Sequence, residues 1–436
     1  MLLEASDLEA LGQTLQAEHI YAELLQRVPG HVDAAGRLAR LAVARGDLQG
    51  GLAVLRVALV HTPGQAGLVL DCASLHHALS EFSAATAMLE GLLTQQPGNF
   101  EAWLLLGQVR ESSGDRSGAL KARFQAVTRA QAGGHWLNEA TTPAPILHTV
   151  VRAIECVRLG RRELLVGTLD DLKAVHGAAG LRRVEAAISG YLRESDCRPS
   201  DPRQRPKFLF FPGLPNAPFH DPHFHSWAKT LEGGFGAIRG EALKVLEEDR
   251  DLPNFISPAP GAPADEYVTG DGPSPSWEAF FFFRHGHRFD ANHARCPQTS
   301  AVLESIELCR IVDHAPEVLF SVLKPGSHIK PHHGVSNIRL VMHMPLLVPN
   351  GCALNLVDRG EHHWSEGRLV MFDDTYLHEA WNRSAQTRVI LLMDCWNPHL
   401  TEIERAALTA FIETIGGLHK ANRAARSAES LGKVGA

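Results

Sequence analysis

Apolar residues recur with two different periods along the chain. Up to about residue 193 they follow the period of an amphipathic helix, as in the Ala- and Leu-rich runs at 33–45 and 48–61. From residue 207 the period becomes two, in short runs rich in β-branched and aromatic residues. The pattern predicts an all-α part followed by a mainly-β part.

The helical part contains an internal repeat of 34 residues. Pro-Gly pairs begin at 29, 63 and 97, and a second set of turn residues keeps the same step at Gly46-Asp47, Ser80-Glu81 and Gly114-Asp115. Helix, turn, helix and Pro-Gly break over about residues 5–132 resemble tetratricopeptide repeats, and the alternative is an unrelated helical bundle. Such repeats stack into a superhelix whose concave face commonly holds a peptide or a partner protein.

Further helices are predicted at 146–158, 161–176 and 179–193. The polar segment 194–206 then indicates an interdomain linker. Strands are predicted at 207–212, 278–283, 316–323, 336–347, 352–357, 368–373 and 387–395, and helices at 226–248 and 402–415. We therefore expect a repeat domain over 1–193, the linker, a double-stranded β-helix (jelly roll) over 207–419, and a flexible tail over 420–436.

Composition narrows the classes of function. A formal net charge of −7 without a basic run argues against nucleic acid as a partner. No apolar stretch has the length of a membrane span, and the N-terminus lacks the features of a secretory signal. Seven scattered cysteines form no CxxC pair, which favours the reducing cytoplasm.

Histidines supply the candidate chemistry, because 16 of the 24 lie after residue 200. His332 in SHIKPHHG and His378 in FDDTYLHEAW lie 46 residues apart. Strands distant in sequence lie side by side in a jelly roll, so both imidazoles could bind one metal ion. The alternative is a pair of structural histidines. His328, His333 and the pair at 362–363 have no such supporting motif.

Arg388 begins the last predicted strand and shares the inward face of Ile390 and Leu392. A buried guanidinium needs an anion, and the distal carboxylate of 2-oxoglutarate suits it, with Ser321 as a further donor. Most oxygenases that use iron and 2-oxoglutarate bind the iron through two histidines and one carboxylate. Here Gly334 takes the carboxylate position, and Asp373 and Asp374 are expected to cap a turn or orient other groups.

These residues closely resemble the aspartyl/asparaginyl β-hydroxylase family over about 190 residues. The resemblance runs from FFPGLP at 210–215, past Trp277 and CPQT at 296–299, to DCWNPHL at 394–400. That family binds iron with two histidines and has glycine at the carboxylate position, and its members often carry tetratricopeptide repeats.

The resemblance implies Fe(II), 2-oxoglutarate and O2 as cofactors. It assigns the metal to His332 and His378, 2-oxoglutarate to Ser321, Trp277, His343 and Arg388, and the substrate to Arg339. Trp277 could instead belong to the core, and Arg388 could instead lie on a surface strand. The family's second arginine is Val341 here, which removes a cation that would hold an acidic group. His293 and Ser300 stand where animal members have paired cysteines.

The expected activity is 2-oxoglutarate-dependent β-hydroxylation of an Asp- or Asn-type residue in a peptide held with help from the repeats. Three alternatives remain open. The substrate could be a free amino acid or a fatty acyl chain, or the chain could be a scaffold with an inactive oxygenase domain.

Overall fold

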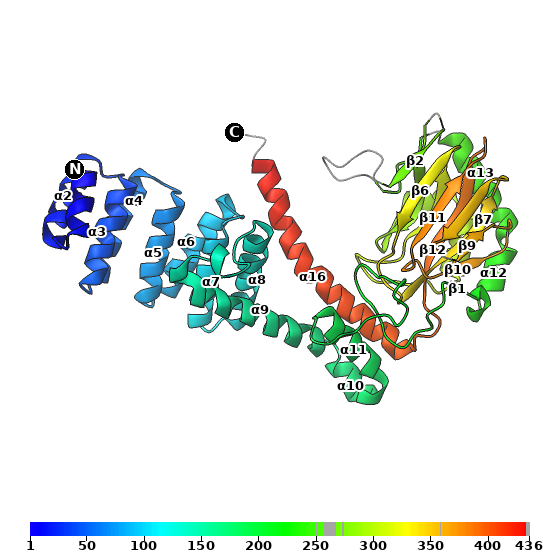
Figure 1. The fold of residues 1–436 in the computed structure, drawn as a ribbon, viewed down its shortest axis with the longest axis horizontal. Helices are drawn as coiled ribbons and strands as arrows, with labels where there is room; N and C mark the ends of the chain where they lie inside the picture. The colour runs from blue at the N-terminus through cyan, green and yellow to red at the C-terminus, as the bar shows by residue number, and fades with distance from the viewer. Residues whose placement is uncertain (250, 257–266, 273, 358, 433–436) are drawn as a thin grey trace. The chain divides into compact units, whose positions relative to one another are not determined.

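The computed structural model describes residues 1–436 except 250, 257–266, 273, 358 and 433–436, with side chains described up to Gly417. The chain forms two compact units, residues 1–163 with 418–436 and residues 164–417. Figure 1 shows the order of their elements.

The first unit is entirely helical in its described residues. Its elements are α1 (Leu2–Ala10), α2 (Thr14–Arg27), α3 (Val32–Ala44), α4 (Leu48–His61), α5 (Ala66–Ala78), α6 (Phe82–Gln95), α7 (Phe100–Ser112), α8 (Arg116–Ala132), the 3₁₀ turns η1 (Glu139–Thr141) and η2 (Ala144–Ile146), and the start of α9 (Leu147–Gly167).

The 34-residue repeat is visible in the backbone of this unit. Gly46, Ser80 and Gly114 all have positive φ, so each equivalent turn reverses the chain in the same way. The side chains of Asp47 and Asp115 then cap the following helices. Ala39 packs so closely on α4 that a Cβ on Gly51 would lie 3.1 Å from its carbonyl oxygen. The predicted tetratricopeptide-like helix pairs are confirmed.

The second unit combines helices with two β-sheets. Its elements are the end of α9, α10 (Asp170–His176), η3 (Ala178–Leu181), α11 (Arg182–Tyr191), β1 (Phe219–His220), η4 (Pro222–Phe224), α12 (Ala228–Gly233), α13 (Phe235–Glu248), β2 (Val268–Gly270), β3 (Trp277–Arg284), β4 (His287–Arg288), α14 (Asp290–Arg295), α15 (Pro297–Glu304), β5 (Val318–Leu323), β6 (Ser327–His332), β7 (Arg339–Leu347), β8 (Cys352–Leu356), β9 (Gly360–His362), β10 (Val370–Phe372), β11 (His378–Asn382), β12 (Arg388–Trp396) and the start of α16 (Glu402–Gly432).

Antiparallel pairing joins the strands of each sheet. The larger sheet has the order β1-β10-β7-β12-β5-β3-β4, and the smaller has the order β2-β6-β11-β8-β9. Apolar side chains from both sheets, including Ile329, Leu354, Phe372 and Ile390, pack together in one core cluster. The two sheets therefore face each other, which confirms the predicted mainly-β domain.

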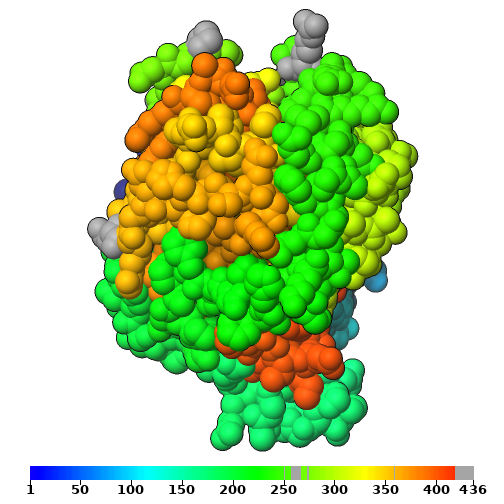
Figure 2. All heavy atoms as spheres, turned by 90° about the vertical axis from the view of Figure 1, so that its right-hand side faces the viewer, coloured from blue at the N-terminus to red at the C-terminus, as the bar shows by residue number. Residues whose placement is uncertain are grey.

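Helices α12 and α13 cover the outer face of the larger sheet. Leu231, Ile238 and Val245 join a core cluster with Phe320 and Leu391. Figure 1 labels both helices beside the strands, and Figure 2 shows green residues bordering the yellow and orange strands. This layer shields one face of the sheet and leaves the space between the sheets for a site.

Three segments of the structure bear on the elements and boundaries predicted from the sequence. Leu181, Val184 and Ile188 pack in one cluster with Phe211 and Phe411, so α11, expected in the repeat domain, belongs to the second unit. The segment 207–212 forms an isolated parallel bridge in place of a strand. Helix α16 extends to Gly432, into the segment 420–436 for which we expected a flexible tail.

The predicted helix 226–248 is also divided, into α12 and α13, at Gly233 and Gly234. Glycine at this point carries the entropic cost that disfavours it in a helix interior. The predicted helices at 146–158 and 161–176 are divided differently, because α9 runs through both to Gly167.

Candidate functional site

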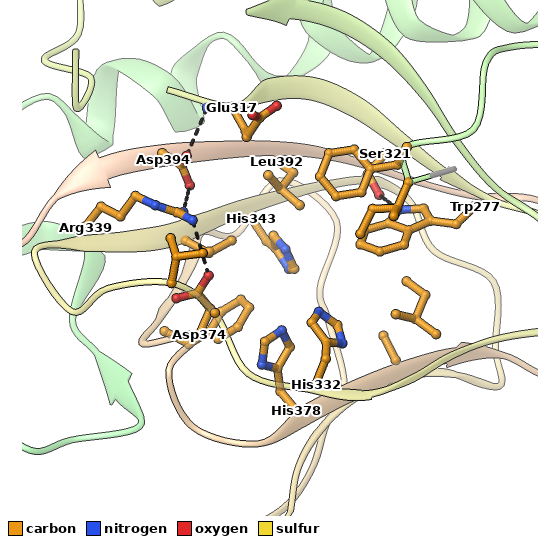
Figure 3. A pocket seen from close by; sticks show the side chains of 18 of the residues that line it. Trp277, Glu317, Ser321, His332, Arg339, His343, Asp374, His378, Leu392 and Asp394 are labelled. Atoms are coloured by element: carbon orange, nitrogen blue, oxygen red, sulfur yellow. Dashed lines mark hydrogen bonds and ion pairs between the residues drawn. The ribbon is translucent and has the colours of Figure 1, made fainter. Parts of the chain in front are cut away.

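A cavity of about 680 Å³ lies in the second unit and is lined by residues of both sheets. Every residue for which we expected a site role lines it: Trp277, Ser321, His332, Arg339, His343, His378 and Arg388. Figure 3 shows His332 and His378 side by side on one wall, with His343 across from them. The fold thus brings together residues that are up to 111 positions apart in sequence.

His332 and His378 are directly opposite each other on the antiparallel strands β6 and β11. Their ring centroids are 4.2 Å apart. The Nδ1 atoms lie 2.8 and 2.9 Å from the carbonyl oxygens of Lys330 and Tyr376, respectively. A carbonyl oxygen only accepts, so Nδ1 carries the proton in each ring and Nε2 keeps its lone pair. Fixing the tautomer in this way is how proteins orient a metal-binding imidazole.

Burial keeps both imidazoles neutral. Desolvation lowers the pKa of His378 to about 3 and also lowers the pKa of His332. A metal ion binds the neutral imidazole, so protons do not compete for Nε2 near neutral pH. The pair therefore has the geometry and protonation state of two metal ligands.

Asp374 fills the space beside Gly334. A Cβ on Gly334 would lie 2.0 Å from Cγ of Asp374, and the Gly334 N–H donates to the Asp374 carbonyl oxygen at 2.6 Å. The Asp374 carboxylate is buried and lines the same cavity as the histidines. A carboxylate is thus present near the position that Gly334 leaves without one, although it comes from another strand end.

Asp373 has the structural role expected for it. Its Oδ1 accepts from the N–H and hydroxyl of Thr375, at 2.9 and 2.5 Å, and its Oδ2 accepts from Gln204 at 2.6 Å. These bonds fix the turn that leads into β11. His378 is positioned through that turn.

Arg388 is a buried cation without a counterion among the described residues. It is 2% exposed, and its Nε has no hydrogen-bond partner. Desolvation lowers the pKa of Arg388 to about 10. Its guanidinium lies over the ring of Trp364, with the Cζ atom 5.4 Å from the centroid. Since an unpaired buried charge is costly, this position is suited to an anion from outside the chain.

Trp277 and Ser321 form a hydrogen-bonded pair on adjacent strands. The indole N–H of Trp277 donates to Oγ of Ser321 at 2.9 Å, and both side chains line the cavity. Because the indole donates to it, the hydroxyl is free to donate its own proton to a ligand. Trp277 thus belongs both to the core and to the cavity wall.

On the expectation that this cavity holds 2-oxoglutarate, we predict that Ser321→Ala weakens its binding about tenfold, because one hydrogen bond to a charged group is lost. The kcat at saturating 2-oxoglutarate should change less than the KM for 2-oxoglutarate. Steady-state succinate formation measures both quantities. An unchanged KM would remove Ser321 from the co-substrate site.

His343 lies on β7 and lines the same cavity as the histidine pair and Arg388. Burial lowers its pKa well below the usual range, and the charge of Arg388 adds to this effect. Its Nδ1 has no hydrogen-bond partner, and its ring lies 5.1 Å from that of Phe372 and 5.8 Å from that of Trp364. A neutral imidazole here could donate or accept one bond from a ligand, as expected for a co-substrate contact.

Arg339 is engaged by carboxylates of the protein itself. Its Nη1 pairs with Oδ1 of Asp394, and its Nη2 lies 3.7 Å from Oδ2 of Asp374. Although burial opposes its charge, these carboxylates raise the pKa of Arg339 above the usual value. The expected substrate cation is therefore already neutralised, which the sequence did not reveal because Asp394 lies 55 residues away on β12.

We predict that Arg339→Met lowers the free energy of unfolding by about 3 kcal/mol, because two buried carboxylates lose their cation. Urea unfolding of the full chain, followed by tryptophan fluorescence, measures the change. Arg383→Met is the matched control, because Arg383 is exposed and its Cζ lies 4.1 Å from the centroid of the Trp381 ring. Equal stabilities of the two variants would contradict the prediction.

Other cavity residues had no expected site role, among them Lys207, Trp364 and Asp394, the last of which the sequence placed only in the motif at 394–400. Lys207 is exposed, and its N–H donates to the carbonyl oxygen of Gly334 at 3.1 Å. It lies on the segment predicted as a strand, and no local pattern connects that segment with residue 334. Trp364 follows the polar run 359–363, so nothing in the pattern distinguished it from a surface residue.

No group of three or more His, Cys, Asp or Glu side chains in the described ranges is arranged to hold a metal ion. A metal site built on His332 and His378 would have those two side chains as its protein ligands. All seven cysteines are free. His293 and Ser300 form a hydrogen bond of 2.7 Å between Nδ1 and Oγ, at the positions where animal members of the family have paired cysteines. None of the described helices combines the length and apolarity that crossing a bilayer requires.

Comparison with known sequences agrees with this arrangement. Residues 232–398 match the family pattern of the aspartyl/asparaginyl beta-hydroxylases, and residues 8–70 and 72–135 match tetratricopeptide repeats. Aspartate beta-hydroxylase domain-containing protein 2 of Rattus norvegicus is 32% identical over 266 residues, covering 58% of this chain and 73% of that protein.

Two other relatives match a smaller part of the chain. The ornithine lipid ester-linked acyl 2-hydroxylase of Rhizobium tropici is 33% identical over 192 residues, which are 44% of this chain and 64% of that protein. The aspartyl/asparaginyl beta-hydroxylase of Mus musculus is 31% identical over 205 residues, 45% of this chain and 26% of that protein. With the paired histidines, the glycine beside them and the repeats ahead of the β-domain, this chain belongs to the aspartyl/asparaginyl β-hydroxylase family.

Proposed function

We propose that this protein is an Fe(II)- and 2-oxoglutarate-dependent dioxygenase that hydroxylates an Asp- or Asn-type side chain of a peptide. Membership of the family supports a hydroxylase. In the proposed reaction one atom of O2 enters a substrate C–H bond, and the other enters the carboxylate of succinate as CO2 leaves 2-oxoglutarate.

The observation that carries the proposal is Arg388. A guanidinium that is 2% exposed and has no carboxylate partner in the described residues lines the same cavity as the two histidines. A dicarboxylic keto acid would bring one carboxylate to this cation and present its other end toward His332 and His378. Ser321 lies on β5, directly opposite Ile390 of β12 and so close to Arg388 along the strands. It would add a hydroxyl donor at the end of the cavity that holds Arg388.

The residues present also fit a ferrous ion. Two neutral imidazoles with fixed tautomers would supply its protein ligands. Imidazole nitrogen is a suitable donor for divalent iron, and a site with few protein ligands keeps positions for co-substrate and O2. The buried Asp374 carboxylate, whose Oδ1 has no hydrogen-bond partner among the described residues, would accept a hydrogen bond from a molecule bound in the cavity.

When bound, iron and 2-oxoglutarate supply the oxidising chemistry for an unactivated C–H bond. The chain's own residues hold and orient the reactants. His343 would contact the keto acid near the histidine pair, and Trp277, Phe372 and Leu392 would exclude water from that region. Dryness matters because it protects the reactive species and strengthens the charged contacts.

The repeat unit suggests that the substrate is a peptide or a protein. Stacked helix pairs of this kind present extended surfaces for partner chains. In the proposal, the repeats contribute affinity for the partner and the cavity contributes the chemistry. In the proposal, the hydroxylated side chain therefore belongs to a peptide or protein that the repeats bind.

Succinate formation by the full chain with Fe(II), 2-oxoglutarate and candidate Asp- and Asn-containing peptides tests the proposal. Mass spectrometry should find one added oxygen in the peptide, in proportion to the succinate formed. If iron stimulates no 2-oxoglutarate turnover, with or without a peptide, the protein is a repeat scaffold and the proposal is wrong.

A further inference from the structure

The cavity wall formed by Arg339, Asp374 and Asp394 carries more negative than positive charge. All three residues line the cavity and are at least nine-tenths buried. One guanidinium faces two carboxyl groups, which gives a formal charge of −1, and desolvation raises the pKa of both carboxyls, that of Asp394 to about 6. Figure 3 shows the three side chains joined by dashed lines beside His378. A carboxylate entering this end of the cavity would meet like charge, which costs binding energy.

The same wall contains both a donor and an acceptor without partners. Nε of Arg339 and Oδ1 of Asp374 make no hydrogen bond to any described residue. Oδ2 of Asp394, in contrast, accepts from the Glu317 N–H at 2.9 Å. The wall therefore has one hydrogen-bond donor, Nε of Arg339, and one acceptor, Oδ1 of Asp374, without partners among the described residues.

No second cation offsets the carboxylates from the next position on the strand. Val341 follows Arg339 on the same face of β7, is opposite Phe372 on β10 and Asp394 on β12, and is aliphatic. Arg388 lies at the end of the cavity with Ser321. Arg284 is held over the Phe281 ring, with its Cζ 4.7 Å from the centroid. Lys207 is exposed, and its charge lowers the pKa of Asp374 less than the charge of Arg339 does.

The chemistry of candidate side chains separates on this wall. A carboxylate can only accept hydrogen bonds and adds a negative charge. An alkyl chain would cover the wall and leave its donor and acceptor unpaired. A primary carboxamide brings an N–H donor for a carboxylate and a carbonyl acceptor for a guanidinium.

We propose that this site selects a carboxamide-bearing side chain, as in asparagine, and rejects both carboxylate and aliphatic side chains at the same position. The inference rests on the proposed hydroxylase function and names the substrate class of that site. Sites built to hydrogen-bond one polar group discriminate strongly against analogues that cannot match it.

Three small probes with matched backbones test the selection: N-acetyl-L-asparagine amide, N-acetyl-L-aspartic acid amide and N-acetyl-L-leucine amide. The full chain is supplied with Fe(II) and 2-oxoglutarate near neutral pH, and succinate formed above the probe-free rate is measured with the oxygenated probe. We expect the asparagine probe to stimulate turnover at least about tenfold more than either other probe.

Equal or greater stimulation by the aspartic acid or leucine probe would overturn the inference, and so would no stimulation by any of the three. In those cases, turnover of 2-oxoglutarate measured without a probe would still support the proposed hydroxylase function, provided that it is lost in His332→Ala. If the wild-type chain lacked that turnover, the proposed function and the inference would fail together.

A charge variant gives an independent test. Val341→Arg should raise the aspartic acid to asparagine ratio of rates about tenfold by adding a cation to the wall. Val341→Leu, which changes size without charge, should keep the wild-type ratio. An unchanged ratio in a Val341→Arg protein that melts near the wild-type temperature would contradict the inference.

Lys207 provides the last comparison. Lys207→Met should leave the ratio at its wild-type value, because an exposed ammonium adds little to selection inside the cavity. Loss of only the aspartic acid reaction in Lys207→Met would assign acid binding to this lysine and overturn the inference.

Discussion

His332→Ala and His378→Ala should each lower iron-dependent succinate formation by at least about 100-fold. Even residues that merely orient metal ligands commonly cost 10- to 100-fold when they are removed, and here one of only two protein ligands is lost. Direct titration with Fe(II) under anaerobic conditions should show the same loss in metal affinity. Metal binding is the more specific measurement, because it does not require the peptide substrate.

His328→Ala is the matched control for both histidine variants. His328 lies on the same strand as His332, but its Nε2 pairs with Glu379 at 2.7 Å and it does not line the cavity. Its loss should leave metal affinity at the wild-type value. Full turnover in both His332→Ala and His378→Ala would show that the metal assignment is wrong.

Arg388→Met should raise the KM for 2-oxoglutarate about 100-fold, since a charge-assisted contact in a dry site is worth a few kcal/mol. The same variant should stabilise the co-substrate-free protein by about 1–3 kcal/mol, because it removes a buried charge without a counterion. Arg388→Lys should restore only part of the affinity, since an ammonium lacks the planar fork that binds a carboxylate through two bonds.

Steady-state kinetics and urea unfolding measure the two opposite effects in one variant. Arg383→Met again serves as control, because that arginine is exposed and lies outside the cavity. An unchanged KM in Arg388→Met would place the distal carboxylate elsewhere. Lower stability of the ligand-free variant would show that Arg388 has a structural counterion.

The period of apolar residues was sufficient for the fold class, because it reflects which faces are buried. It predicted β3, β5, β7, β8, β10 and β12 within a few residues. It missed β6 and β11, which carry the two histidines. Pro331 and the polar residues around it disguise β6, and its pairing with β11 depends on contacts that no local pattern contains.

The sequence was sufficient where the position of a residue depends on burial alone, and insufficient where residues neutralise each other. The pattern of β12 placed Arg388 inside, and burial without a counterion agrees with that prediction. Arg339 was expected as a cation of the substrate site, and the sequence did not show that Asp394 on the neighbouring strand pairs with it. Charge balance depends on three-dimensional neighbours, so the sequence could show the cation and not its partner.

The close packing of Asp374 on Gly334 also constrains how this centre could change over evolutionary time. Any side chain at 334 would collide with that carboxylate, whose backbone is held by the Gly334 N–H. A carboxylate side chain at 334 therefore requires the Asp374 carboxylate to move or to be replaced by a smaller group. The gain of another acidic group beside the histidine pair thus depends on position 374 as well as on position 334.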